Sequence, residues 1–351
     1  MDLLNVATTV LGAIVILVVT ADAIQVTLGV RPRSRRSAPS TLFYGWTLRL
    51  LRRATHRLDA GRSERLLAWF GPVSILGLLG FWFVGHSLGF ALIWTALPGA
   101  FEEPLGFDEA FYFSGVTYLT IGFGEIVPIS DWARFIAIAQ GLIGVVMVAL
   151  VMGFLATLYG IFIDRERQLK MLDLPGHDRI RPIDLVAYVQ RGVAGEERLR
   201  AFFSDWAVWA AGITTWHTTY PIVAFFRSQH PGQSWITALG LLTDSAVIAL
   251  VEHDGDHPEA EQMYRRGVQA ITNTPMGSED PGLVISREEW ESGFARARAH
   301  GMDLGDEQAA FEEMTRLREP YAETLGAVMR ALAAPPDMWS SSTPAVPRHD
   351  Q

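Results

Sequence analysis

The chain has 351 residues, of which 49% are hydrophobic, a formal net charge of −9 and no cysteine. The acidic balance argues against a nucleic-acid-binding surface, and the lack of cysteine excludes disulfides and thiolate metal sites. The first half is apolar and the second half is more charged, so we expect two domains of different character. We find no nucleophile and base at a recognisable catalytic spacing and expect a protein that is not an enzyme.

The first expected element is an apolar run from residue 3 to about residue 28, within the segment 1–30. It is long enough to span a bilayer, and it lacks the basic start and the small-residue cleavage site of a signal peptide. We expect Asp22, near its end, to reach the interface or to pair with a nearby arginine. The arginines that follow place this flank in the cytoplasm and the N-terminus outside: Arg31, Arg33, Arg35 and Arg36.

Residues 41–58, within the basic segment 31–65, combine apolar positions on one side with interleaved arginines. An amphipathic helix that carries Trp46 and several arginines belongs at the membrane surface, where we expect it to lean on the next membrane helix. The alternative is a voltage-sensing helix, because arginines that move through the field couple voltage to gating. Only one apolar run precedes this segment, so the surface helix is the simpler interpretation.

Residues 66–97 form the second run of spanning length. His86 lies within it, and we expect a neutral imidazole bonded to a neighbouring helix, with a proton sensor as the alternative. The run also carries glycines that suit close packing against another helix: Gly77, Gly80, Gly85 and Gly89.

A short apolar segment leads from residue 108 into a stretch that predicts a cation-selectivity filter. Glycine at every second position permits the backbone dihedrals that present successive carbonyl oxygens to an ion. The filter residues are Thr120, Ile121, Gly122, Phe123 and Gly124, and Glu125 follows at the outer mouth. Acidic residues on both sides would raise the local cation concentration: Glu102, Glu103, Asp108, Glu109 and Asp131.

The stretch from Leu119 to Pro128 resembles the Thr-Val-Gly-Tyr-Gly filter of tetrameric potassium channels, and the resemblance covers residues 66–165. Ile121 and Phe123 stand where that family most often has Val and Tyr. The resemblance implies an outer helix at 66–97, a pore helix and filter at 108–128, an inner helix at 133–163, and K⁺ ions held by the filter oxygens. One filter loop cannot surround an ion, so we expect a homotetramer.

The inner helix is the third spanning run, and it ends in Asp164, Arg165 and Arg167, which we place on the cytoplasmic side. The resemblance makes Gly144 the candidate gating hinge, because it lies at the distance from the filter threonine where that family often bends. Gly141 and Gly153 are competing bend points. Close helix packing is the alternative role for these glycines.

Residues 166–333 predict an all-α cytoplasmic domain, because charged helical faces alternate with proline and glycine breaks. Ser286 with Glu289 forms an expected capping box, and Asp306 is an expected N-cap. The apolar runs at 206–226 and 235–251 are interrupted or short, so we interpret them as core helices, with membrane spans as the alternative. No nucleotide-binding motif is found, and an unknown cytoplasmic ligand or protein partner is possible.

Two polar groups in this domain are candidate sites. The first is expected to form a buried network, either structural or ligand-binding: His217, Tyr220, Arg227 and Asp244. The second offers oxygen and imidazole donors to a metal ion, although the spacing fits no known motif and a polar loop is the simpler interpretation: His253, Asp254, Asp256 and His257. The composition of residues 334–351 predicts a disordered tail.

Taken together, these patterns predict an all-α membrane protein with a two-helix potassium-channel pore domain, a re-entrant pore loop, an extra N-terminal transmembrane helix and an all-α cytoplasmic domain. We expect a homotetramer in the lipid bilayer of the cell membrane that conducts K⁺ passively and needs no organic cofactor. Its gate would lie at the inner helix, under the influence of the cytoplasmic domain. The alternatives are a non-selective cation channel and a non-conducting sensor or scaffold.

Overall fold

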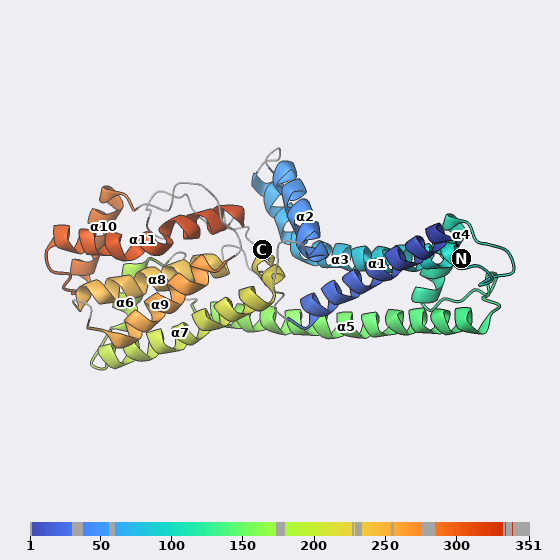
Figure 1. Ribbon diagram of the computed structural model, residues 1–351. Coiled ribbons are helices and arrows are strands. Elements are labelled where there is room, and N and C mark those ends of the chain that lie inside the picture. The colour runs from blue at the N-terminus through green and yellow to red at the C-terminus, as the bar shows by residue number, and fades with distance from the viewer. Residues whose placement is uncertain are drawn as a thin grey trace, which may run out of the picture. The chain divides into compact units, whose positions relative to one another are not determined.

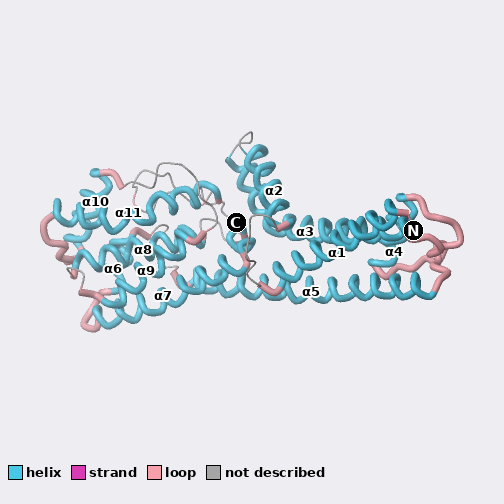
Figure 2. The backbone as a smooth tube through the Cα atoms, in the orientation of Figure 1, coloured by secondary structure: helices cyan, strands magenta, loops and turns pink. Residues whose placement is uncertain are grey.

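The computed structural model describes residues 2–29, 38–55, 60–172, 180–226, 228, 234–253, 256–274, 285–332, 334 and 339. These described residues form helices joined by loops and contain no strand (Figure 2). The chain divides into two compact units, Met1–Gly160 and Ile161–Gln351 (Figure 1). The expected all-α fold is confirmed. The arginines at 31, 33, 35 and 36 lie outside the described residues.

The first unit is built around two helices that pack in opposite directions. It contains α1 (Leu3–Thr27), α2 (Pro39–Thr55), α3 (Ala60–Ala96), α4 (Phe107–Tyr118) and most of α5 (Asp131–Lys170). Gly12 of α1 meets Gly89 of α3, and Val19 meets Gly85. A Cβ on Gly12 would lie 2.5 Å from the Gly89 carbonyl oxygen, so glycine is required for this approach. The expected close packing is confirmed at Gly85 and Gly89.

The amphipathic helix α2 leans on α3, as expected. The Phe43 ring covers Gly77 and lies 5.6 Å from the Phe81 ring. Arg49 and Arg53 are exposed, and the guanidinium of Arg49 donates to the Gly45 carbonyl of its own helix. These two arginines therefore have no acidic countercharge among the described residues, and the voltage-sensor alternative stays a prediction.

The arginines that follow Asp22 lie outside the described residues, so its pairing with one of them stays a prediction. Its carboxylate is buried and accepts hydrogen bonds from the Ser40 amide, the Ser40 hydroxyl at 2.7 Å and the Trp82 indole at 2.9 Å. These donors come from α2 and α3 and satisfy the charge that burial would otherwise penalise. Asp22 thus joins the end of α1 and the start of α2 to the middle of α3.

The second unit surrounds one central helix. It contains the end of α5, then α6 (Pro182–Val189), α7 (Gly195–Thr219), the 3-10 turn η2 (Pro221–Phe225), α8 (Trp235–Glu252), α9 (Pro258–Thr272), α10 (Arg287–Ala299) and α11 (Glu307–Ala331). The central helix α8 packs against α6, α7, α9 and α11. The expected capping box of Ser286 and Glu289 begins α10, and the Asp306 carboxylate accepts from the Ala309 amide to begin α11. Both caps are confirmed.

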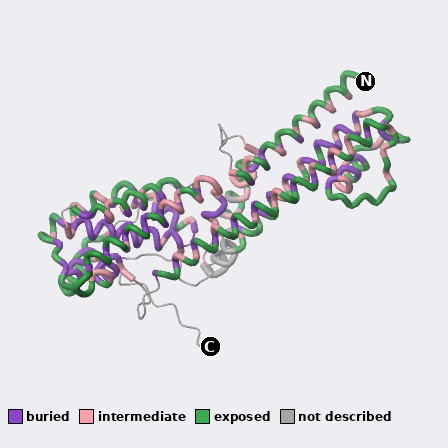
Figure 3. Tube along the Cα trace, turned by 90° about the horizontal axis from the view of Figure 1, so that it is seen from below, coloured by how far each residue is buried: buried purple, intermediate pink, exposed green. Residues whose placement is uncertain are grey.

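Within the described residues, four helices have the length and composition to cross a membrane: Leu3–Thr27, Trp69–Ala96 within α3, Asp131–Lys170 and Trp235–Glu252. Only 17% of the apolar stretch in α1 and in α5 is buried within the chain, against 89% in α8 (Figure 3). Exposed apolar surfaces as large as those of α1 and α5 need lipid or another chain to cover them. The protein itself encloses α8, which favours the core-helix interpretation of residues 235–251.

A buried carboxylate ties α8 to α11 and to the end of the chain. Asp244 accepts hydrogen bonds from the Arg318 Nε at 2.9 Å, the Tyr321 hydroxyl and the Trp339 indole at 2.7 Å. The network expected between Asp244 and His217 is wrong, because His217 forms no hydrogen bond, and Arg227 lies outside the described residues. Trp339 is buried, so the predicted disorder of the tail fails at this residue.

Candidate functional site

The short helix α4 ends at Tyr118, directly before the glycine-rich stretch of residues 120–124. Its first turn carries acidic side chains, and the Glu109 carboxylate accepts from the Gly106 amide at 2.9 Å. At the other end, the Thr120 amide donates to the Thr117 carbonyl and the Ile121 amide to the Val116 carbonyl. The chain therefore leaves the helix through a tight turn. The negative end of the helix dipole lies where the glycine-rich stretch begins, which favours a cation there.

The stretch after α4 alternates in backbone handedness. The φ angles of Thr120, Gly122 and Gly124 are +55°, +62° and +93°, and no other non-glycine residue among those described has a positive φ. Threonine in the left-handed region is strained, and such strain is retained where surrounding structure and function require it. When every second residue has a left-handed backbone conformation, successive carbonyl groups can point toward the same side of the extended stretch. This geometry suits a column of oxygen ligands.

A buried glutamine connects the three helices around this stretch. The Gln140 amide nitrogen of α5 donates to the Ser114 carbonyl at 2.8 Å and to the Ser114 hydroxyl at 2.7 Å. Its amide oxygen accepts from the Trp94 indole of α3 at 3.0 Å. All three side chains are buried, so the polar atoms satisfy one another in an apolar surrounding. Sequence reasoning missed this group, because nothing in the local pattern marks these positions.

The last residue of α4 is held from two sides. The Tyr118 ring stacks on His86 with ring centroids 5.2 Å apart, and its hydroxyl lies 3.4 Å from His86 Nδ1. The same Nδ1 donates to the Trp82 carbonyl, so Nε2 is left to accept from the Thr20 hydroxyl at 2.9 Å. One neutral imidazole satisfies all of these contacts. They favour the expected structural role of His86 and link α1 to the end of α4.

On its other side, the end of α4 touches Gly144. A Cβ at Gly144 would lie 2.0 Å from the Tyr118 carbonyl oxygen and 2.9 Å from the carbonyl carbon. A Cβ at Gly141 would lie 3.8 Å from the Thr117 carbonyl oxygen, which is an ordinary contact. A Cβ at Gly153 would meet no atom of this chain within 4 Å. The helix α5 runs unbroken through all three glycines. Gly144 therefore has a packing role here, and its role as a hinge stays a prediction.

The segment predicted to form the outer mouth is acidic and exposed. The Tyr112 hydroxyl of α4 donates to the Glu125 carboxylate, and this bond lowers the pKa of Glu125 below its usual range. The neighbouring acidic side chains are all exposed: Glu102, Glu103, Asp108, Glu109 and Asp131. This bond connects α4 to the residue that follows the glycine-rich stretch.

Of the candidate metal ligands in the second unit, His253 and His257 lie together, with ring centroids 5.2 Å apart, and both face Glu196. His253 Nε2 lies 3.2 Å from a Glu196 carboxylate oxygen, and His257 Nδ1 accepts from the Ala260 amide at the start of α9. Asp256 is exposed, and Asp254 lies outside the described residues. Within the described part of the chain, no group of three or more ligand side chains could hold a metal ion. The metal site stays a prediction.

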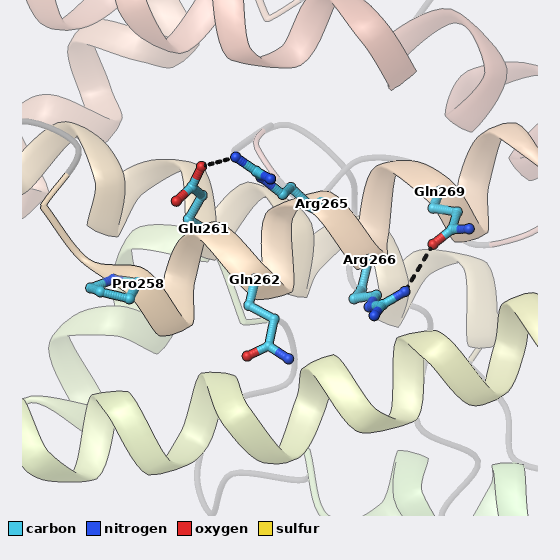
Figure 4. Close-up of a pocket in the computed structure, with 6 residues that line it drawn as sticks. All are labelled: Pro258, Glu261, Gln262, Arg265, Arg266 and Gln269. Atoms are coloured by element: carbon cyan, nitrogen blue, oxygen red, sulfur yellow. Dashed lines mark hydrogen bonds and ion pairs between the residues drawn. The ribbon is translucent and has the colours of Figure 1, made fainter.

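An open pocket of about 350 Å³ lies on the outer surface of α9. Figure 4 shows its lining, in which Arg265 pairs with Glu261 and Arg266 bonds to Gln269. Both arginines are therefore engaged along the helix surface. The lining residues all come from the same helix: Pro258, Glu261, Gln262, Arg265, Arg266 and Gln269. No polar groups from a second element converge on this pocket, and we assign it no ligand.

His217 should make the protein less stable in acid. Burial, and then the charge of Arg165, lower the pKa of His217 to about 3. The unfolded chain binds a proton near pH 6.5 that the folded chain cannot bind, so stability falls as the pH drops below that value. At pH 5 the loss is about 2 kcal/mol. Denaturant unfolding at pH 7.5 and pH 5 should show this loss, and His217→Phe should remove it; equal losses in both proteins would contradict the assignment.

This part of the chain is similar to known membrane proteins. The family model described as ion channel matches residues 76–160, which include α4 and the glycine-rich stretch. Protein LctB of Bacillus caldotenax is 32% identical over 107 residues, which make up 30% of this chain and 77% of that protein. An uncharacterized membrane protein of Bacillus subtilis, YdjJ, is 21% identical over 202 residues, 55% of this chain and 57% of that protein. No solved structure matches the chain.

Proposed function

Because the chain belongs to the ion channel family, we propose that it forms a potassium-selective pore, in which K⁺ passes between backbone oxygens from Thr120 to Phe123. The observation that carries the proposal is the alternation of positive φ at Thr120, Gly122 and Gly124. It occurs directly at the negative end of α4, where a partly dehydrated cation is favoured. Conduction of this kind is passive and needs no organic cofactor.

The proposed pore is a homotetramer in a lipid bilayer. One copy of the filter offers ligands from one side only, and in a single chain Ile121 is 50% and Phe123 is 70% exposed. Four copies around an axis would surround the ion and cover these side chains. The exposed apolar side chains of α5 supply further surface for contacts between subunits and with lipid.

The proposed topology places the N-terminus outside and the second unit in the cytoplasm. Since α1 runs opposite to α3, its N-terminal end lies beside α4, as Figure 1 shows within the first unit. The filter entrance of the proposed pore faces outward, and so does the start of α1. The gate lies toward the inner end of α5, and the second unit influences it.

The test is potassium flux into liposomes that contain the purified protein, with liposomes in sodium alone as the reference. Gly122→Ala should abolish the flux, because alanine at φ +62° is strained and distorts the carbonyl column. Gly99→Ala is the matched control: Gly99 has φ +71° in a loop outside the filter, and its Cβ would meet nothing within 4 Å.

Flux that requires potassium, persists in Gly99→Ala and is lost in Gly122→Ala would support the proposal. Equal flux of sodium would favour the non-selective channel. Intact tetramers that carry no flux, even after deletion of the residues beyond Lys170, would refute conduction and favour the sensor or scaffold.

A further inference from the structure

Arg165 is buried where its sequence position suggests an exposed basic flank. It lies near the end of α5, in the part of that helix that belongs to the second unit, and its side chain is 0% exposed. The nearby Arg167 is 72% exposed and pairs with Asp164 on the helix surface. Two arginines two positions apart therefore have different environments. Only Arg165 is enclosed, so only its burial needs a structural reason.

The guanidinium of Arg165 binds the end of the turn η2. One terminal nitrogen donates to the Val223 carbonyl at 3.1 Å, and the other donates to the Phe226 carbonyl. The second nitrogen also lies 3.4 Å from the Glu166 carboxylate, which accepts from the Ser228 hydroxyl. The bonds thus run from consecutive residues of α5 to residues 223–228, about 60 positions away along the chain.

This contact suits arginine and no other cation. The planar guanidinium can donate hydrogen bonds to two carbonyl oxygens at once, whereas the ammonium of lysine is a compact point charge on a flexible stem. The Val223 carbonyl also accepts from the Phe226 amide, so the guanidinium adds a charged donor to Val223 and supplies one to the Phe226 carbonyl. Apolar contacts support it: the guanidinium lies 5.4 Å from the Phe162 ring centroid, and the Phe162 and Phe226 ring centroids are 6.0 Å apart.

We propose that Arg165 is the positioning residue through which the second unit acts on the pore: it fixes the inner end of α5 to residues 223–228. The helix α5 is continuous from Asp131 to Lys170, so a restraint on its last turns bears on the same helix that touches the filter turn at Gly144. Any rotation or splaying of the end of α5 must carry η2 along or break these bonds. A ligand or partner that moves η2 would thereby change ion flux. This inference rests on the proposed channel function.

The test combines two measurements on Arg165→Met, Arg165→Lys and Arg167→Met in the full-length protein. Hydrogen exchange of a peptide that covers residues 221–226 should be about tenfold faster in Arg165→Met, the loss expected for a hydrogen bond to a charged group. Potassium flux should change by about fivefold or more, the low end of typical coupling between sites, with the preference for potassium over sodium unchanged. Arg165→Lys should lie between, and Arg167→Met should match the wild type in both measurements.

Faster exchange with unchanged flux per tetramer would overturn the inference, because Arg165 would then be merely structural. Unchanged exchange would overturn it too. If Arg165→Met fails to fold, Ser228→Ala removes one bond to Glu166, and unchanged flux in both Ser228→Ala and Arg165→Lys would overturn the coupling. A wild-type protein without flux would instead show that the proposed channel function has failed.

Discussion

Gly144→Ala should eliminate most of the ion flux and lower the stability of the protein. The added methyl group would lie 2.0 Å from the Tyr118 carbonyl oxygen, well inside van der Waals contact. The methyl group is fixed to the α5 backbone, and the oxygen belongs to the backbone of α4. Neither can rotate away as a side chain would, so α5 and the end of α4 must move apart. Thr120 begins the proposed filter two residues after Tyr118, so this displacement acts directly on the proposed conduction path.

The same variant separates the two roles of Gly144. Alanine is a better helix former than glycine by about 0.5–1 kcal/mol, so loss of a hinge alone would leave stability unchanged or raise it. Overpacking costs about 1–3 kcal/mol, which outweighs that gain. We therefore expect the thermal unfolding temperature to fall together with the flux. A fall in flux with unchanged or raised unfolding temperature would contradict the packing role and support the hinge.

Gly153→Ala is the control on the same helix. Its Cβ would meet nothing within 4 Å of this chain, so only the helix-forming gain should appear in its stability. Gly80→Ala offers the same comparison on α3, where the methyl group also meets open space. If the two controls keep flux and Gly144→Ala loses it, the contact with the Tyr118 carbonyl accounts for the difference.

The alternating backbone of the glycine-rich stretch could be predicted from the sequence because its information is local. A glycine at every second position, directly after a short apolar helix, specifies the backbone without reference to the rest of the chain. The spanning helices are equally local, since length and apolarity define them. The sequence predicts that the glycines of α3 pack closely against another helix. It does not predict that Gly85 and Gly89 meet α1, because helical spacing alone does not tell which helix will lie against them.

Contacts between distant residues account for what the sequence pattern did not show. Asp22 accepts from Ser40 and Trp82, which lie 18 and 60 positions away, and no local pattern indicates these donors. Arg165 follows the composition rule for a cytoplasmic flank, and that rule carries no information about burial. Trp339 lies in a stretch whose average composition predicts disorder. A single buried indole with a carboxylate partner 95 positions away is enough to order that residue.

Asp244→Asn should destabilise the second unit by about 3–5 kcal/mol, the usual cost of removing one member of a buried ion pair. The carboxylate is fully buried and balances the charge of Arg318. Both of its oxygens act as acceptors, because the Arg318 guanidinium, the Tyr321 hydroxyl and the Trp339 indole all donate to it. Asparagine would put an N–H₂ group at one of these positions, facing a donor, and would leave the guanidinium charge unbalanced in the core.

Burial, and then Asp244, raise the pKa of Tyr321 well above its usual range, so its hydroxyl stays a donor at every pH of interest. The cost of Asp244→Asn should therefore be the same at pH 7 and pH 9. It can be measured by denaturant unfolding followed through tryptophan fluorescence, since Trp339 lies at the site. Asp205→Asn on the exposed face of α7 is the control, and a surface change of this kind alters stability by no more than about 0.5 kcal/mol.

A second variant distinguishes the ion pair from the shape of the side chain. In Asp244→Leu with Arg318→Met, both charges are replaced by apolar groups, which often restores much of the stability lost when a buried pair is broken. The Tyr321 hydroxyl and the Trp339 indole would still lack Asp244 as their acceptor, so recovery should be partial. If the double variant is no more stable than Asp244→Leu alone, the unbalanced charge of Arg318 is not the main cost. Asp244 would then act chiefly as the acceptor that fixes Tyr321 and Trp339 in place.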